Sequence, residues 1–189
     1  MNGSADLRLS PLDGVHRAAG ARMVPFGGWD MPVSYPTGTI AEHMACRQGT
    51  TVFDVSHLGS LELSGPGVFD QLQAALSNDL RRVRPGRAQY THLLEEADAS
   101  VVDDIIVWWL GVDRFWILPN AANNAGVVEA LPGCVDVAAD RTLLALQGPT
   151  ARSVLSSVSP EAAEVGRFGV ATFLWRGEEA MVAGTGYTG

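Results

Sequence analysis

The alternation of hydrophobic and polar positions is clearest in residues 86–109, where two extended runs flank a polar turn. Residues 88–94 alternate, residues 95–100 are small and polar, and residues 101–110 are almost wholly apolar. Alternation with period two, and runs rich in β-branched and aromatic residues, are both typical of strands. We therefore predict two strands joined by this turn.

Two acidic residues, Asp103 and Asp104, interrupt the second apolar run. Successive side chains of a strand point to opposite faces of the sheet. One aspartate is therefore expected to face inward or into a cavity, and the other to face the opposite side. An inward carboxylate requires hydrogen bonds, a cationic partner or a function. Adjacent acids are equally typical of turns and sheet edges, and the pattern alone leaves both interpretations open.

The rest of the chain mixes helical spacing with short strand-like runs. Helices are predicted over residues 12–19, 40–47, 68–75 and 151–157, with Thr39 and Thr150 as caps, and between the turn at 119–123 and residue 131. Strands are predicted at 21–31 (with a glycine turn), 51–56, 60–64, 114–118, 143–146, 170–175 and 180–183, and a loop at 32–38. Many hairpins and few long crossovers favour an α+β fold in which helices flank antiparallel sheets.

Composition narrows the class of protein. The chain has 189 residues, is 47% hydrophobic and carries a net charge of −8, which argues against a general nucleic-acid binder. No apolar run reaches the roughly 18–20 residues that cross a bilayer, and no signal peptide is visible. Cys46 and Cys134 are far apart, which indicates a reducing environment. These features predict a soluble, cytoplasmic protein.

The residues that could carry chemistry form no familiar short motif such as a P-loop or CxxC. The four histidines are His16, His43, His57 and His92, and none has ligand spacing with another, so no metal site is predicted. His57 follows a predicted strand and is either catalytic or a structural hydrogen-bonding residue. Three glycine-rich turns and several aromatic residues could form a pocket for a flat ligand.

A dense basic cluster stands out against the acidic chain. Its members are Arg81, Arg82, Arg84 and Arg87. Such a cluster is either an ordinary solvated face or a docking site for an acidic partner or a carboxylate-bearing ligand.

Nine short motifs, taken in order, resemble the aminomethyltransferases, the T-proteins of the glycine cleavage system. They are Met23–Pro32, Glu42-His43, Val52–Gly59, Ser77–Asp79, Gly86–Tyr90, Val102–Val107, Asn120–Asn123, Ala145–Pro149 and Thr185–Gly189. The resemblance runs from about residue 12 to the end and covers roughly the first half of a T-protein. Together with the turn-rich last residues, it predicts that the chain is a fragment of a longer protein.

The resemblance implies a fold of three domains around a central folate pocket. Residues 1–52 and 139–189 would form the first folate-binding domain, incomplete and discontinuous, and residues 53–138 a second α+β domain. The C-terminal barrel domain would be missing.

The resemblance also implies a function. The aminomethyl group on the lipoyl arm of H-protein would be transferred to tetrahydrofolate, with release of ammonia. H-protein and tetrahydrofolate are therefore the expected partners, with no nucleic acid and no membrane, and the arginine cluster could help to receive an acidic H-protein. Relatives of the same fold leave two alternatives open, a tetrahydrofolate-dependent demethylase and a non-catalytic folate-binding module.

Carried over position by position, the family's catalytic carboxylate is Asp104, which would bind the pterin and orient the attacking folate nitrogen. A carboxylate fixed in an apolar strand can stabilise developing positive charge, which agrees with this role. The implied folate-binding residues are Leu58, Tyr90, Trp108, Asn120 and Tyr187.

Two departures from the family pattern affect the site. Gly184 stands where the family usually has arginine, and the chain ends before a glutamate that follows the last motif and contacts folate. The resemblance therefore predicts that the chain, as given, binds folate weakly or not at all and has little transferase activity.

Overall fold

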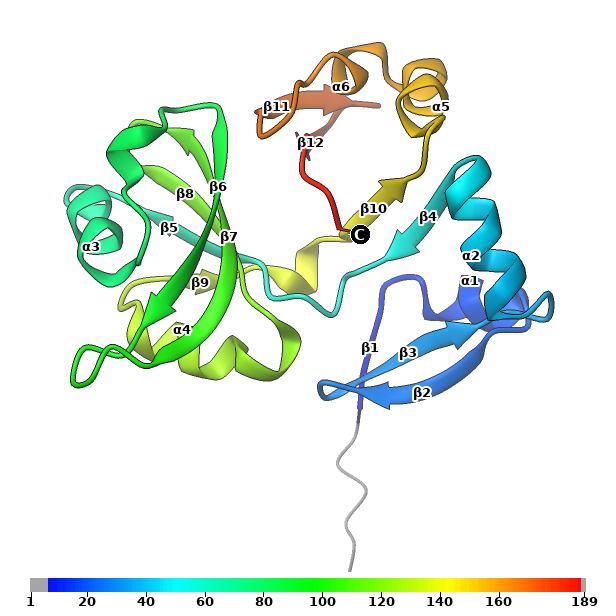
Figure 1. Ribbon diagram of the computed structural model, residues 1–189, viewed down its shortest axis with the longest axis horizontal. Coiled ribbons are helices and arrows are strands. Elements are labelled where there is room, and N and C mark those ends of the chain that lie inside the picture. Colours follow the sequence, from blue (N-terminus) through cyan, green and yellow to red (C-terminus); the bar gives the residue numbers. More distant parts are fainter. Residues whose placement is uncertain (1–6, 188–189) are drawn as a thin grey trace, which may run out of the picture.

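A five-stranded sheet occupies one side of the computed structural model, which describes residues 7–187 (Figure 1). Its order is β6-β7-β8-β5-β9, and every neighbouring pair is antiparallel. The strands are β5 (Leu61–Ser64), β6 (Arg87–Leu94), β7 (Val101–Gly111), β8 (Arg114–Leu118) and β9 (Val135–Asp136). β6 and β7 confirm the hairpin predicted from residues 88–94 and 101–110.

Alternation along these strands gives the sheet two apolar faces. One face carries Leu61, Leu93, Ile105, Val107 and Ile117, which are at most 1% exposed. Helices α3 (Val68–Ala75) and α4 (Asn124–Ala130) contribute buried residues to the same cluster. The sheet therefore has a complete hydrophobic core on this side, as the helical spacing of residues 68–75 predicts.

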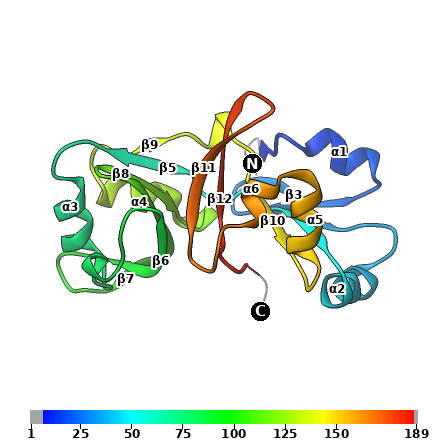
Figure 2. The same ribbon diagram turned by 90° about the horizontal axis from the view of Figure 1, so that it is seen from above.

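The opposite face of the sheet is covered by a separate hairpin. Its strands are β11 (Val170–Trp175) and β12 (Glu178–Ala183), and its turn places Arg176 and Gly177 at positive φ. Two consecutive positive φ values suit the right-handed twist of the flanking strands. Val170 packs with a cluster that contains Trp108 and Trp116, so the hairpin lies beside the five-stranded sheet, as Figure 2 shows.

The other elements form two small sheets and their helices. Strands β1 (Arg8–Leu9), β3 (Trp29–Ser34) and β2 (Arg22–Phe26) form one sheet in that order, and β10 (Leu144–Gln147) pairs antiparallel with β4 (Thr51–Asp54). The helices are α1 (Asp13–Ala18), α2 (Thr39–Gln48), α5 (Ala151–Val158) and α6 (Pro160–Ala163), with 3-10 turns η1 (Leu80–Arg82), η2 (Ala121–Asn123) and η3 (Ala138–Asp140). The predicted α+β class with antiparallel sheets and flanking helices is confirmed.

The loop predicted from residue 32 is wrong for its first three residues, because β3 continues to Ser34 and pairs Pro32 with Met23. β1 pairs only with Trp29 and Asp30 of this strand. Proline lacks a backbone N–H, so it is tolerated in a strand where no neighbour requires that donor.

The predicted cap at Thr39 is wrong, whereas the one at Thr150 is correct in position. Gly38 is the N-cap of α2, and Thr39 is already its first helical residue. Thr150 is the N-cap of α5, but its side chain makes no capping hydrogen bond. Its hydroxyl instead lies 2.7 Å from the hydroxyl of Thr50, so a tertiary contact has replaced the local one.

A buried polar network ties the N-terminal elements to β4. The Asp54 carboxylate is 1% exposed and accepts hydrogen bonds from Ser10 Oγ and from the Ser56 N–H. His16 lies between Asp54 and Tyr35, with its ring nitrogens 2.8 Å from Asp54 Oδ2 and 2.8 Å from the tyrosine hydroxyl. Burial acts to raise the pKa of Asp54, but these hydrogen bonds outweigh it, and the pKa lies below its ordinary value.

The five-stranded sheet falls entirely within residues 53–138, the segment expected to form the second domain. The division of the chain into two domains stays a prediction. Thr188 and Gly189, which end the last family motif, lie outside the described residues.

Candidate functional site

The two adjacent aspartates of β7 face opposite sides of the sheet. Asp103 is 2% exposed, whereas Asp104 is exposed to solvent. The Asp103 carboxylate accepts hydrogen bonds from the Asn120 N–H (2.8 Å), the Asn120 side-chain amide (2.9 Å) and the Asn123 side-chain amide (2.6 Å). Three donors satisfy this buried charge, so Asp103 anchors the segment that follows β8.

Asp104 is held from two sides at the surface of the sheet. Tyr90, on the neighbouring strand β6, donates its hydroxyl proton to Asp104 Oδ2 at 2.8 Å, and the Asn120 amide donates to Oδ1 at 2.8 Å. The hydrogen bond from Tyr90 to Asp104 raises the pKa of the phenol, which keeps it in its donor form. A carboxylate has about four acceptor positions, so Asp104 can still accept hydrogen bonds from a ligand on its open side.

Leu58 lies in a turn that touches the same segment. The N–H of the next residue, Gly59, donates to the carbonyl of Pro119 at 2.9 Å. A Cβ atom at Gly59 would overlap the ring of Pro119 and the amide oxygen of Asn124. The absence of a side chain therefore lets the turn that carries Leu58 approach the residues on either side of Asn120.

The hairpin turn between β2 and β3 reaches this segment as well. A Cβ atom at Gly27 would lie 2.7 Å from the Cβ of Ala121. Its neighbour Phe26 meets the ring of His57 edge-on, with ring centroids 5.2 Å apart. Residues 119–121 are thus contacted by two turns that come from other parts of the chain.

His57 lies in the same turn as Leu58 and Gly59. Its Nδ1 atom is buried and has no hydrogen-bond partner among residues 7–187. Burial lowers the pKa of His57, and the negative charge of Asp54 only partly opposes this effect. His57 is therefore a neutral imidazole next to Leu58.

Two predicted site residues lie apart from the Tyr90–Asp104–Asn120 group. Trp108 is 7% exposed, under the β11–β12 hairpin, and its indole N–H has no acceptor among the described residues. Tyr187 is 48% exposed, and its backbone N–H donates to the side-chain carbonyl of Gln147 at 3.1 Å. No hydrogen bond or ring contact recorded between residues 7 and 187 joins either residue to Asp104.

Comparison with known proteins identifies the family. The GCVT N-terminal domain matches residues 12–189, nearly the whole chain. The chain belongs to this family. An aminomethyltransferase of Parafrankia sp. (strain EAN1pec) is 41% identical over 192 residues, covering 97% of this chain and 52% of that protein. One of Frankia alni is 43% identical over 194 residues, covering 98% of this chain and 52% of that protein.

A solved structure supports the same assignment for this GCVT domain. The glycine cleavage system aminomethyltransferase T from Bartonella henselae superposes with a TM-score of 0.80 at 34% identity, covering 87% of this chain and 47% of that one. The chain thus spans about half the length of the relatives that it matches.

Sequence reasoning missed the parts that Asp103 and Asn123 play in this GCVT domain. Both residues stood in motifs, but their contact joins positions 20 residues apart. The spacing of Asn120 and Asn123 was the available signal, because residues three apart share one side of a helical turn.

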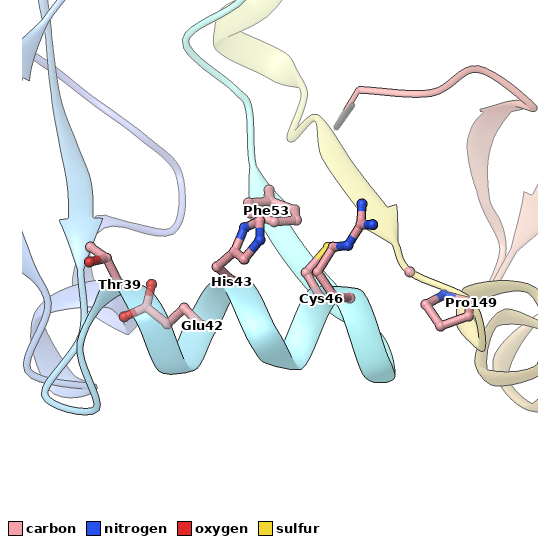
Figure 3. A pocket seen from close by; sticks show the side chains of 8 residues that line it. Thr39, Glu42, His43, Cys46, Phe53 and Pro149 are labelled. Atoms are coloured by element: carbon pink, nitrogen blue, oxygen red, sulfur yellow. The ribbon is translucent and has the colours of Figure 1, made fainter.

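A hollow of about 500 Å³ lies elsewhere, between α2, β4 and the segment after β10 (Figure 3). Its lining includes Glu42, His43 and Cys46 from α2, and Phe53 from β4. Glu42 accepts a hydrogen bond from the Tyr35 N–H at 2.7 Å. None of the predicted site residues lines this hollow, so the candidate site is the open group around Asp104 instead.

Residues 7–187 include no group of three histidine, cysteine or acidic side chains that could hold a metal ion. The same residues include no helix long and apolar enough to pass through a bilayer.

Proposed function

We propose that this GCVT domain acts in a glycine cleavage aminomethyltransferase, as the part that holds tetrahydrofolate. The observation that carries the proposal is the exposed carboxylate of Asp104, with one oxygen held by Tyr90 and the other by Asn120. The aminomethyltransferase names of relatives that match almost all of this chain support it.

Asp104 would accept hydrogen bonds from the N–H groups of the pterin ring on its open side. Its negative charge would orient the attacking folate nitrogen and stabilise the positive charge that develops as that nitrogen forms its new bond to carbon. Tyr90 and Asn120 would fix the rotamer of the carboxylate, which lowers the cost of ordering it when the substrate binds.

The donor would be the aminomethyl group on the lipoyl arm of H-protein. Transfer of its carbon to tetrahydrofolate would release ammonia and return the lipoyl group as a dithiol. In this proposal Leu58 contacts the pterin from the turn beside Asn120, and Trp108 and Tyr187 line more distant parts of the folate site. Because Asp104 and Tyr90 are both exposed, we expect weak folate binding and little turnover by the chain alone.

The test is titration calorimetry of tetrahydrofolate with the unaltered chain and with Asp104→Asn. The substitution removes the charge but keeps the shape, and losing a charged hydrogen bond is worth about 1.5–3 kcal/mol, or roughly 10–150-fold in affinity. We expect a loss in that range.

Asp113→Asn is the matched control, because Asp113 is an exposed aspartate in the turn between β7 and β8. The control should bind tetrahydrofolate like the unaltered chain. Equal affinity of Asp104→Asn and the unaltered chain would contradict the role of Asp104. Turnover at the rate of a full-length relative would contradict the expected weakness of the chain alone.

A further inference from the structure

All 13 basic residues of the chain are arginines, and three of them line one hollow of about 460 Å³. Arg82, Arg84 and Arg87 surround it, together with Val83. Along the chain, these residues follow α3 and run to the first residue of β6. Arg81, the fourth arginine of the cluster noted in the sequence, is held instead by Asp79, with its Nε 2.8 Å from the carboxylate. The structure thus separates one paired arginine from three others.

The charges of the three lining arginines are neutralised locally only in part, since Asp79, the partner of Arg81, also interacts electrostatically with Arg82. We name the hollow lined by Arg82, Arg84 and Arg87 the arginine hollow. Between residues 7 and 187, no side-chain hydrogen bond or ion pair is recorded for these three arginines. Arg17 and Arg114, by contrast, each contact a carboxylate within 3 Å. A cluster of cations without ion pairs in the described part of a chain of net charge −8 is an electrostatic feature that a partner can use.

The backbone around the arginine hollow is fixed at several points. Leu80 is 1% exposed and anchors the η1 turn that carries Arg82. Gly86, at φ +82°, donates to the carbonyl of Trp109 at 2.7 Å and accepts from the N–H of Val170 at 2.8 Å. The arginines therefore project from an ordered frame, which reduces the entropy lost on binding.

The arginine hollow is separate from the folate residues. Arg87 precedes Tyr90 by three residues on β6, about 10 Å along the strand. Odd and even residues of a strand face opposite sides, so Arg87 and Tyr90 project from different faces of the sheet. Changes in the hollow should therefore leave tetrahydrofolate binding intact.

We propose that the arginine hollow docks an acidic segment of a partner protein. The guanidinium groups bind the carboxylates of that segment. Guanidinium groups bind carboxylates in a planar, two-pronged geometry, which suits aspartate and glutamate side chains. A nucleic acid is the less favoured anion, because a general nucleic-acid binder usually presents an extended basic face and this chain has a net charge of −8. This inference rests on the proposed function, in which the partner is lipoylated H-protein.

The experiment compares two double charge reversals in the chain as it exists. Arg82→Glu with Arg84→Glu removes the hollow's charge, and Arg22→Glu with Arg47→Glu is the control. Both control arginines are exposed and have no recorded side-chain ion pair among the described residues. Both variants change the net charge from −8 to −12, since each reversal subtracts two.

Binding of lipoylated H-protein and of hexaglutamate peptide is measured at low and high salt. We expect the hollow variant to bind both probes at least about tenfold more weakly and to lose most of the salt dependence. The control variant should stay within about threefold of the unaltered chain.

Three results would overturn the proposal: equal weakening in both variants, no binding of either probe by the unaltered chain, or tighter binding of a single-stranded hexanucleotide than of hexaglutamate. Tetrahydrofolate titration of the same variants separates this proposal from the proposed function. If the chain binds tetrahydrofolate through Asp104 but the hollow variant and the control variant bind the probes equally, the proposed function stands and only the docking site is contradicted.

Discussion

Asp103 and Asp104 have identical side chains. Their surroundings differ because successive residues of a strand face opposite sides of the sheet. Asp103 points into the core side of the sheet and accepts from three N–H donors, while Asp104 points outward and accepts from one O–H and one N–H donor. The same amide, that of Asn120, touches both carboxylates. Removing Asn120 would therefore disturb the buried anchor and the exposed site together.

At the residue scale, His57 predicts a pH effect on stability. Its pKa is lowered by burial in the folded chain, so below its ordinary value of about 6.5 only the unfolded chain takes up the proton. The free energy of unfolding should fall as the pH drops below about 6.5, by up to about 1.4 kcal/mol per pH unit. His57→Gln should flatten this slope in urea unfolding between pH 5 and 7.5.

His43→Gln is the control for that measurement, because His43 is exposed on α2. It should leave the pH slope as it is in the unaltered chain. A slope of the same size in His57→Gln would show that other groups cause it.

At the scale of elements, residues 119–121 are where three parts of the chain meet. β8 ends there, the turn with Gly59 hydrogen-bonds to Pro119, and the β2–β3 turn touches Ala121. These contacts depend on close backbone approach. A single added methyl group should therefore affect both stability and the position of Asn120.

Gly59→Ala tests that contact. The added Cβ would overlap Pro119 and Asn124, and overpacking of this kind costs about 1–3 kcal/mol. In a chain of this size we expect the melting temperature to fall by roughly 2–12 °C. Calorimetric melting measures the shift, and tetrahydrofolate affinity should fall with it.

Gly14→Ala provides the matched glycine substitution. Gly14 lies in α1 with nothing within 4 Å of an added Cβ, and alanine favours helix more than glycine does. This variant should melt at the same temperature as the unaltered chain or higher. If Gly59→Ala melted at the same temperature as Gly14→Ala, the close approach at Pro119 would be unimportant for stability.

At the scale of the whole molecule, distant segments are joined by polar contacts as well as by the two apolar clusters. Asp54 connects Ser10 and His16 to β4 across 44 and 38 residues, and Thr50 meets Thr150 across 100. The first of these contacts is buried and charged. Acid should therefore weaken the attachment of the N-terminal elements.

Asp54→Asn tests this attachment. The pKa of Asp54 is lowered in the folded chain, so its stabilising effect is complete above the ordinary value of about 3.9 and is lost as the pH falls below it. The unaltered chain should lose stability below about pH 4. The variant should be less stable by about 1–3 kcal/mol at pH 7 and change less in acid.

Chemical unfolding from pH 2.5 to 7 measures this dependence, with Asp113→Asn as an exposed aspartate control. The control should follow the unaltered chain at every pH. An acid response of full size in Asp54→Asn would assign that response to other carboxylates.

The strands of this fold could be predicted because period-two alternation is a local property, and β6, β7 and β8 keep it. The cap at Thr39 could not, because Gly38 takes the N-cap position. At Thr150 the position was predicted, but a tertiary hydroxyl contact with Thr50 replaces the side-chain capping bond. The apolar strand marked Asp103 and Asp104 as a pair, and only the family resemblance singled out Asp104. The Asp54 network was not marked, since its partners lie far away in the sequence.

The aspartate pair of β7 has a consequence for the direction in which a ligand enters. No ion pair recorded among residues 7–187 includes Asp103 or Asp104, so the carboxylates on the two faces of this strand have no local counter-ion. Their combined field attracts N–H groups and repels carboxylates. In the proposed function, a molecule with a polar ring at one end and an acidic tail at the other would therefore approach Asp104 with its ring first.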